Sequence, residues 1–231
     1  MVAMATSLLA KRETAAAKYS AMGALRSLLR LMRPNTRLTE AVPVVAKPRP
    51  RNVLISDEER QAMLLTAAPF LQCFILLCGD LALRSGTAAR IAPEHYDPIS
   101  QELRYVTKGG RTMHMPVTRQ LVRLFELVPA DADRTRPYVQ HLYGRSITQH
   151  ALIRQFARLC GRLGIRGKTP HDLRRSTAVK VMDITKDLRV VQHLLGHTSL
   201  DSTLYYLDHD YGHVDRELIE EAAKGRKAHQ A

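Results

Sequence analysis

The order of apolar and polar positions along the chain predicts mostly helices and one short hairpin. In two stretches, 102–107 and 111–117, apolar and polar residues alternate as in strands, on either side of a Lys108-Gly109-Gly110 turn whose glycines tolerate positive φ. Elsewhere after position 56, apolar residues recur at helical spacing. This spacing predicts helices at 57–67, 70–83, 86–91, 118–128, 147–163, 171–183, 187–195, 199–207 and 214–224. We therefore expect a mainly α domain with a small antiparallel β-sheet, an α+β fold.

The first quarter of the chain has a different pattern. Residues 4–32 are rich in Ala and Leu and predict one helix, which ends before Pro34. Several prolines among basic residues at 34–55 are typical of an extended linker. Ser56-Asp57-Glu58-Glu59 then has the S-x-x-E form of a helix-capping box. We predict a basic N-terminal helix at 1–33, a linker at 34–55, a main domain at 56–212 and a C-terminal helix and tail at 213–231.

The charge of the chain is strongly basic. Lys and Arg outnumber Asp and Glu by 35 to 22, which gives a formal net charge of +13. Residues 1–55 hold ten Lys or Arg and two Glu, so +8 of that charge lies in the first quarter. Such a field favours DNA, RNA or an anionic membrane surface as a partner, although a basic protein can also lack a nucleic-acid role.

Hydropathy argues against a membrane protein. No apolar run reaches the roughly 20 residues of a bilayer span. The apolar stretch at 7–10 is too short for a signal peptide and is followed directly by Lys11 and Arg12. We therefore expect a cytoplasmic protein without membrane contact.

Neither the cysteines nor the histidines predict a metal site or another cofactor. Cys73, Cys78 and Cys160 are odd in number and lie in apolar helical surroundings, which indicates buried reduced thiols. His193 and His197 have an H-x-x-x-H spacing that could hold zinc on a helix. However, Leu194 stands where a zinc protease has its glutamate, and Gly196 interrupts the helix.

Two positions near the middle of the second half could bind a phosphate. Pro170 precedes His171, so His171 is expected to open a helix with Arg174 on the same face of its first turn. A helix N-terminus attracts anions, and an arginine adds two donors for two phosphate oxygens. Taken alone, the same residues could form an ordinary capping turn at the surface.

A tyrosine follows at a short distance. Gly196 is a natural residue to end a helix, so His197 should leave it, and the next short helix then presents Tyr206. Tyrosine is a weak nucleophile at its ordinary pKa of about 10 and needs nearby cations and a base. The adjacent Tyr205 would point about 100° away on a helix, and we expect its ring to pack instead.

These residues resemble the catalytic core of the tyrosine site-specific recombinases, the phage integrase family. That family carries an arginine, a lysine on a hairpin, an H-x-x-R motif, a histidine or tryptophan after Leu-Gly, and a tyrosine about nine residues later. Residues 169–176 and 194–206 match the last three elements. Upstream, 81–86 resembles the first arginine motif and points to Arg84, and 105–110 resembles the hairpin and points to Lys108. The resemblance covers roughly 56–210.

The resemblance implies a site-specific DNA recombinase or integrase with the catalytic-domain fold of that family. Tyr206 would attack a DNA phosphate and form a 3′-phosphotyrosyl link, so that rejoining needs no ATP, metal or other cofactor. The positively charged and histidine side chains would stabilise the transition state or move protons. The implied roles are charge stabilisation by Arg84, Arg174 and His197, proton acceptance by His171, and protonation of the leaving 5′ oxygen by Lys108.

The resemblance also implies partners, and two departures from the family pattern qualify it. Double-stranded DNA, a homotetramer on two DNA sites and a nucleoid-associated location in the cytoplasm are expected. Thr87 stands where the family commonly has an acid. Residues 1–55 are too short for the family's separate core-binding domain, so 1–33 is an arm or a remnant and an accessory protein could supply the clamp. The alternatives are a DNA-binding accessory factor of the same fold without productive cleavage, and a type IB topoisomerase-like enzyme.

Overall fold

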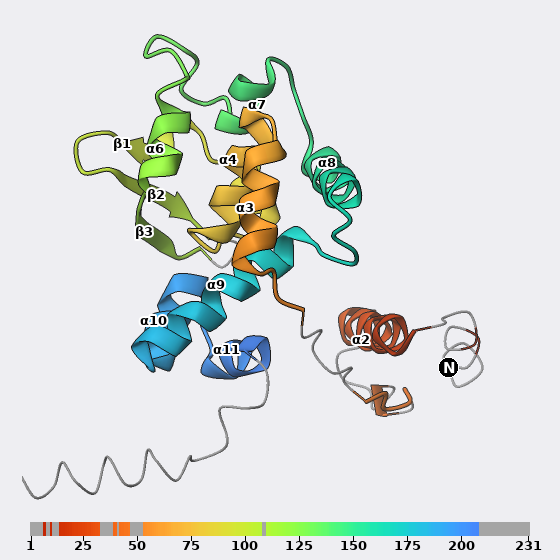
Figure 1. The fold of residues 1–231 in the computed structure, drawn as a ribbon. Coiled ribbons are helices and arrows are strands. Elements are labelled where there is room, and N and C mark those ends of the chain that lie inside the picture. Colours follow the sequence, from red (N-terminus) through yellow and green to blue (C-terminus); the bar gives the residue numbers. More distant parts are fainter. Residues whose placement is uncertain are drawn as a thin grey trace, which may run out of the picture. The chain divides into compact units, whose positions relative to one another are not determined.

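The computed structural model describes residues 14–32, 39–40, 42–46, 53–107 and 110–207, together with residues 7 and 10. The side chains of Asp201, Tyr205 and Tyr206 lie outside this description. The chain divides into two compact units, Met1–Arg51 and Asn52–Ala231. Figure 1 shows the helices and strands of each unit.

The first unit is built on helix α2 (Ala15–Met32). Met22, Leu25 and Leu29 lie on one face of α2 and are buried together with Val42 from the segment that follows. Arg26 fastens this segment to the helix, because its Nη2 donates to the carbonyl oxygens of Val42 at 3.2 Å and Pro43 at 2.7 Å. The rest of the helix predicted at 4–32, except residues 7 and 10, and parts of the 34–55 linker lie outside the described residues.

The second unit begins with the capping box that the sequence predicts. Ser56 Oγ accepts from the backbone N–H of Glu59 at 3.2 Å, and the Glu59 carboxylate accepts from the backbone N–H of Ser56 at 3.0 Å. The helices that follow in order are α3 (Asp57–Thr66), α4 (Pro69–Gly79), α5 (Ser85–Ala88), α6 (Arg119–Phe125), α7 (Tyr138–Tyr143), α8 (Gln149–Arg162), α9 (Pro170–Thr185), α10 (Leu188–Leu195) and α11 (Leu200–Leu207). A short 3-10 helix, η2, covers Pro93–His95. The helix predicted at 214–224 lies outside the described residues.

The sheet is small and antiparallel, with strand order β1-β2-β3. Strands β2 (Glu102–Val106) and β3 (Thr112–Pro116) form the predicted hairpin, and β1 (Tyr96–Asp97) adds a two-residue edge that the sequence did not reveal. In the register, Leu103 pairs with Met115 and Tyr105 with Met113. These four side chains are buried while their neighbours along each strand are not, which is the expected alternation.

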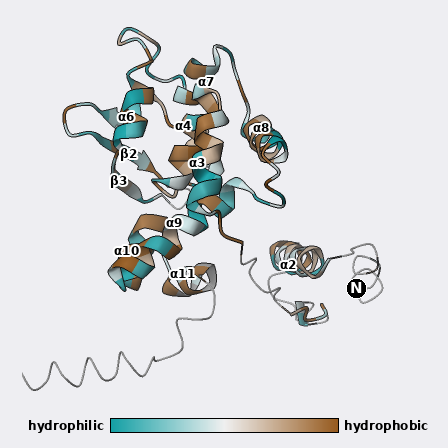
Figure 2. Cartoon of the chain, in the orientation of Figure 1, coloured by the Kyte–Doolittle hydropathy of each residue, from teal (hydrophilic) through white to brown (hydrophobic). Residues whose placement is uncertain are grey.

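The main core surrounds α4, which is apolar on all sides and is covered by α3, α6, α7, α8 and α9. Much of α4 is coloured as hydrophobic in Figure 2. Its Phe74, Ile75 and Leu77 are 0% exposed, as expected for a helix without a polar face. The three cysteines are free and buried, as predicted.

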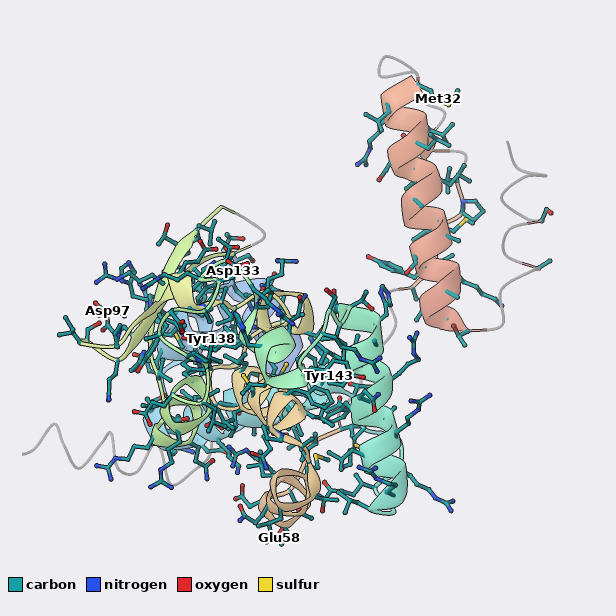
Figure 3. The ribbon with its side chains drawn as sticks, turned by 90° about the horizontal axis from the view of Figure 1, so that it is seen from above. Met32, Glu58, Asp97, Asp133, Tyr138 and Tyr143 are labelled. Carbon is teal, nitrogen blue, oxygen red and sulfur yellow. The ribbon has the colours of Figure 1, made fainter. Side chains whose placement is uncertain are left out.

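Helix α7 was missed by the sequence reading, yet it contributes two aromatic contacts to the main core. Tyr138 stacks on Phe125 with ring centroids 3.8 Å apart, and Tyr143 lies against Phe70 at 4.6 Å. Figure 3 labels both tyrosines, which are the first and last residues of this helix. The helix is only six residues long, too short for a periodic signal.

A second, smaller apolar cluster lies among α9, α10, α11 and the loop after α4. Its buried members are Ala82, Ala178, Val191, Leu195 and Leu207. The fold is therefore mainly α with a small antiparallel sheet, as predicted. Among the described residues, no helix has the length and hydrophobicity that a bilayer crossing requires.

Candidate active site

The start of α9 is fixed by its own capping residues. The Asp172 carboxylate accepts from the backbone N–H of Thr169 at 2.7 Å and from its hydroxyl at 2.9 Å, and Pro170 occupies the first turn. The predicted helix start is therefore confirmed to within one residue, with His171 in the first turn and Arg174 three residues further along the helix. His171 is exposed, whereas Arg174 is 3% exposed.

Arg174 joins three segments that are distant in sequence. Its guanidinium donates to the carbonyl oxygen of Ala82 and, at 2.8 Å, to that of Leu195. Nη2 also lies 3.3 Å from Nε2 of His197. A buried charge is costly unless it is hydrogen-bonded, and these contacts bind both terminal nitrogens of the guanidinium and hold it at one place.

The loop that carries Ala82 has an unusual backbone. Ala82 has φ of 49° and is 0% exposed, although left-handed φ is uncommon for a residue with a Cβ. This turn ends α4 at Gly79, before the predicted limit of 83, and the chain reaches Arg84 two residues later. Arg84 is the exposed N-cap residue of α5, so the loop brings both arginines to the same region.

His197 follows the end of α10 as predicted, because Gly196 ends that helix in the left-handed conformation with φ of 57°. The ring is 8% exposed, and its Nδ1 lies 3.1 Å from Oγ1 of Thr203. Burial and then the charges of Arg174 and Arg84 lower the pKa of His197 to about 4. The ring is therefore neutral at physiological pH in the DNA-free protein.

His171 is also affected by its surroundings. Partial loss of water around the ring and the positive charge of Arg174 lower the pKa of His171, and Arg84 acts in the same direction. The side chain is nevertheless exposed, so it can meet a ligand. A neutral imidazole is able to accept a proton.

The β2–β3 hairpin reaches the end of α10. A Cβ placed on Gly196 would lie 3.3 Å from Cγ2 of Thr107, and Arg111 Nη2 lies 2.9 Å from Nδ1 of His193. Lys108 itself lies outside the described residues, but Arg111 contacts His193 of α10, and Thr107 lies close to Gly196, which follows that helix. This close approach gives Gly196 a second reason to be a glycine.

Two buried residues near the site were missed by the sequence reading. Tyr105 on β2 is 7% exposed; burial raises its pKa to about 12, while the charges of Arg174 and Arg84 oppose that rise. Strand alternation could have placed Tyr105 on the inner face, three residues before Lys108. Thr203 is 0% exposed, and no sequence signal distinguished it from the other hydroxyl residues of α11.

Helix α11 packs on α9 and α10, and Figure 1 shows the three helices together. Leu207 is 4% exposed and belongs to the smaller apolar cluster. The backbone of Tyr206 lies in this helix, while its side chain is outside the description. The structure thus brings Arg84, His171, Arg174 and His197 together, beside the helix of Tyr206.

This arrangement suits an anionic ligand. The charges of two guanidinium groups act on two neutral histidines there. Such a site can bind the oxygens of a phosphate group and stabilise extra charge on them.

Comparison with known proteins identifies the family. The family model described as the phage integrase family matches residues 55–213. The chain is 27% identical over 203 residues to the tyrosine recombinase XerC of Agrobacterium fabrum, covering 80% of this chain and 64% of the relative. It is 30% identical over 185 residues to XerC of Rhodospirillum centenum, covering 74% and 54%. The chain therefore spans roughly half to two thirds of these relatives.

Solved structures share the fold at low sequence identity. A lambda integrase dimer bound to a COC' core site has a TM-score of 0.68 at 16% identity, with 93% of this chain and 65% of that chain covered. The XerH site-specific recombinase bound to difH substrate has a TM-score of 0.65 at 20% identity, with coverage of 96% and 68%. With the family match over 55–213, these findings show that the chain belongs to the phage integrase family of tyrosine recombinases.

Proposed function

We propose that this chain cleaves and rejoins DNA at specific sites through a 3′-phosphotyrosyl intermediate on Tyr206. The observation that carries the proposal is the placement of Arg174, which contacts the loop before Arg84, the end of α10 and the ring of His197. Four residues of the family motifs, Arg84, His171, Arg174 and His197, lie near one another in this arrangement, which supports the proposal.

In the proposed reaction, the Tyr206 oxygen forms a bond to the phosphorus as the bond from phosphorus to the 5′ oxygen breaks. Arg84 and Arg174 bind the non-bridging oxygens and stabilise their charge, together with His197. His171 accepts the phenol proton, and Lys108 gives a proton to the leaving 5′ oxygen. The reverse step, attack by a 5′ hydroxyl, restores the DNA and the tyrosine, so neither ATP nor metal is consumed.

The lowered histidine pKa values support these roles. With the pKa of His171 below its ordinary value, its ring is neutral and able to accept a proton at pH 7. An imidazole at His197 avoids adding a third full positive charge beside two arginines before the phosphate arrives.

For the whole chain, we propose a division into a basic arm or core-binding remnant at 1–33, a linker at 34–55, a catalytic domain at 56–212 and a C-terminal helix and tail at 213–231. The partner is double-stranded DNA, and two sites are joined by a homotetramer in a nucleoid-associated complex. The lambda integrase structure is bound to a core site and the XerH structure to difH substrate, which supports the choice of partner. A clamp-supplying protein would complete the complex.

The test is a suicide DNA substrate, nicked so that the released fragment diffuses away and the protein–DNA adduct accumulates. We expect wild type to form the adduct in EDTA and mass spectrometry to find the DNA on Tyr206. Tyr206→Phe should bind DNA and form no adduct, whereas Tyr205→Phe should form it. Tight binding without any adduct on wild type would favour the accessory-factor alternative, and relaxation of supercoiled DNA by the monomer would favour the topoisomerase-like one.

A further inference from the structure

Thr203 occupies a fully buried place beside the ring of His197. Its side chain is 0% exposed, and its hydroxyl oxygen lies 3.1 Å from Nδ1 of His197. Thr203 belongs to α11, three residues before Tyr206, whereas His197 precedes that helix. The contact therefore joins a histidine of the candidate site to the helix that carries the proposed nucleophile.

The neighbours of the His197 ring determine which of its nitrogens carries the proton. Nε2 lies 3.3 Å from Nη2 of Arg174, and a guanidinium donates hydrogen bonds but cannot accept them. Nε2 must therefore accept, and the single proton of the neutral ring is on Nδ1. From Nδ1 the proton is donated to the hydroxyl oxygen of Thr203.

We propose that Thr203 is a positioning residue that orients the His197 ring and ties this orientation to the packing of α11. The hydroxyl oxygen can accept from Nδ1 in both the neutral and the protonated ring, so the ring keeps its direction: Nε2 of the neutral ring accepts from Arg174, and Nε2–H of the protonated ring can donate to a phosphate oxygen bound there. The catalytic consequence rests on the function proposed above.

The contact between Thr203 and His197 also links the histidine to the helix of the proposed nucleophile. Thr203 and Tyr206 are three residues apart on α11, so they move together when the helix shifts. A displaced α11 would therefore remove the nucleophile and release the His197 ring in one step. Cleavage would thus require a docked α11 for two chemical reasons.

The decisive comparison uses two variants of Thr203 and one neighbour. Thr203→Val keeps the shape of the side chain and removes the acceptor, whereas Thr203→Ser keeps the hydroxyl. Ser202→Ala removes an exposed hydroxyl from the same helix and serves as the control. Thermal melting of all three variants checks that each is folded.

The first measurement needs no DNA. ¹⁵N–¹H NMR distinguishes the two neutral tautomers of a histidine, and the His197→Gln variant identifies the His197 signals. We expect the Nδ1–H tautomer in all four proteins, because Arg174 requires Nε2 to accept in each of them. The Nδ1 proton should resonate downfield in wild type, Thr203→Ser and Ser202→Ala, where it is hydrogen-bonded, and should shift upfield or broaden in Thr203→Val. An unchanged Nδ1 proton signal in folded Thr203→Val would overturn the proposal.

The second measurement is single-turnover adduct formation on the suicide substrate. Thr203→Val should slow it by roughly 10- to 100-fold without weakening DNA binding, because a misplaced catalytic group costs up to about 10²-fold. Thr203→Ser should restore most of the rate. If folded Thr203→Val reacted like wild type, or folded Thr203→Ser were as slow as Thr203→Val, the hydroxyl would have no positioning role. If wild type formed no adduct, the proposed function would fail, while the NMR result would still decide the contact.

Discussion

The two apolar clusters of the second unit are built in different ways. Around α4, large side chains such as Phe74 are completely buried among other apolar groups. Among the described side chains, the cluster among α9, α10 and α11 has five buried apolar members, and beside it lie the buried polar groups of Arg174, His197 and Thr203. The large core defines the fold through packing, whereas the small cluster defines the site through hydrogen bonds.

This difference explains why the candidate site lies beside the small cluster and not in the large core. Apolar packing tolerates changes of side chain as long as volume is kept, but buried polar groups require particular partners at particular distances. A phosphate site needs charges held in one geometry, and the carbonyl oxygens of Ala82 and Leu195 provide this for Arg174. The geometry of the candidate site therefore depends on few contacts, each of which can be tested separately.

The largest effect is expected when the guanidinium of Arg174, the buried cation beside the small cluster, is removed. Arg174→Ala should bind DNA yet slow adduct formation by roughly 10²- to 10³-fold, the usual cost of losing one such charge stabiliser. Single-turnover kinetics on the suicide substrate measure the rate, and gel shifts measure binding. Arg123→Ala, which removes an exposed arginine from α6, should react at the wild-type rate. Equal rates for both variants would remove Arg174 from the mechanism.

More of the large core than of the small cluster could be predicted from the sequence. The all-apolar run of α4, the β2–β3 alternation and the helix ends at Ser56 and Gly196 each follow from a local pattern. The spacing of His171 and Arg174 placed both on one turn, but spacing does not specify that Arg174 is buried.

What the sequence did not reveal depends on distant partners. The left-handed Ala82 is held in a loop whose carbonyl oxygen meets Arg174, 92 residues away. Thr203 is one hydroxyl residue among several until the ring of His197 lies beside it. Very short elements such as β1 likewise have no periodicity to detect.

A smaller effect should appear in the dependence of stability on pH. The pKa of His197 is about 4 in the folded protein and about 6.5 in an unfolded chain, so its neutral form favours folding. This contribution is complete above pH 6.5 and is lost as the pH falls toward 4, because the unfolded chain takes up the proton first. The loss is on the order of 3 kcal/mol at most.

Urea unfolding of wild type and His197→Gln between pH 7 and pH 4 measures this contribution. The variant should lose less stability over that window than wild type. His114→Gln, which changes an exposed histidine on β3, should follow wild type closely. If the free energies of unfolding of wild type and His197→Gln fell in parallel as the pH is lowered, the surroundings of His197 would not hold its ring in the neutral form.

The smallest effect on stability is expected when one buried alanine in each cluster is replaced by glycine. Ala82 and Ala88 are each 0% exposed, one in the small cluster and one in the main core. Ala88→Gly should lower the free energy of unfolding by about 2 kcal/mol, since it loses a buried methyl group and helix propensity. Ala82→Gly loses a methyl group as well, but it removes a left-handed strain of about 1 kcal/mol, so its stability should stay within about 1 kcal/mol of wild type. Urea unfolding at pH 7 measures both. If Ala82→Gly were as destabilised as Ala88→Gly, packing of the methyl group, and not backbone geometry, would be what holds this loop against Arg174.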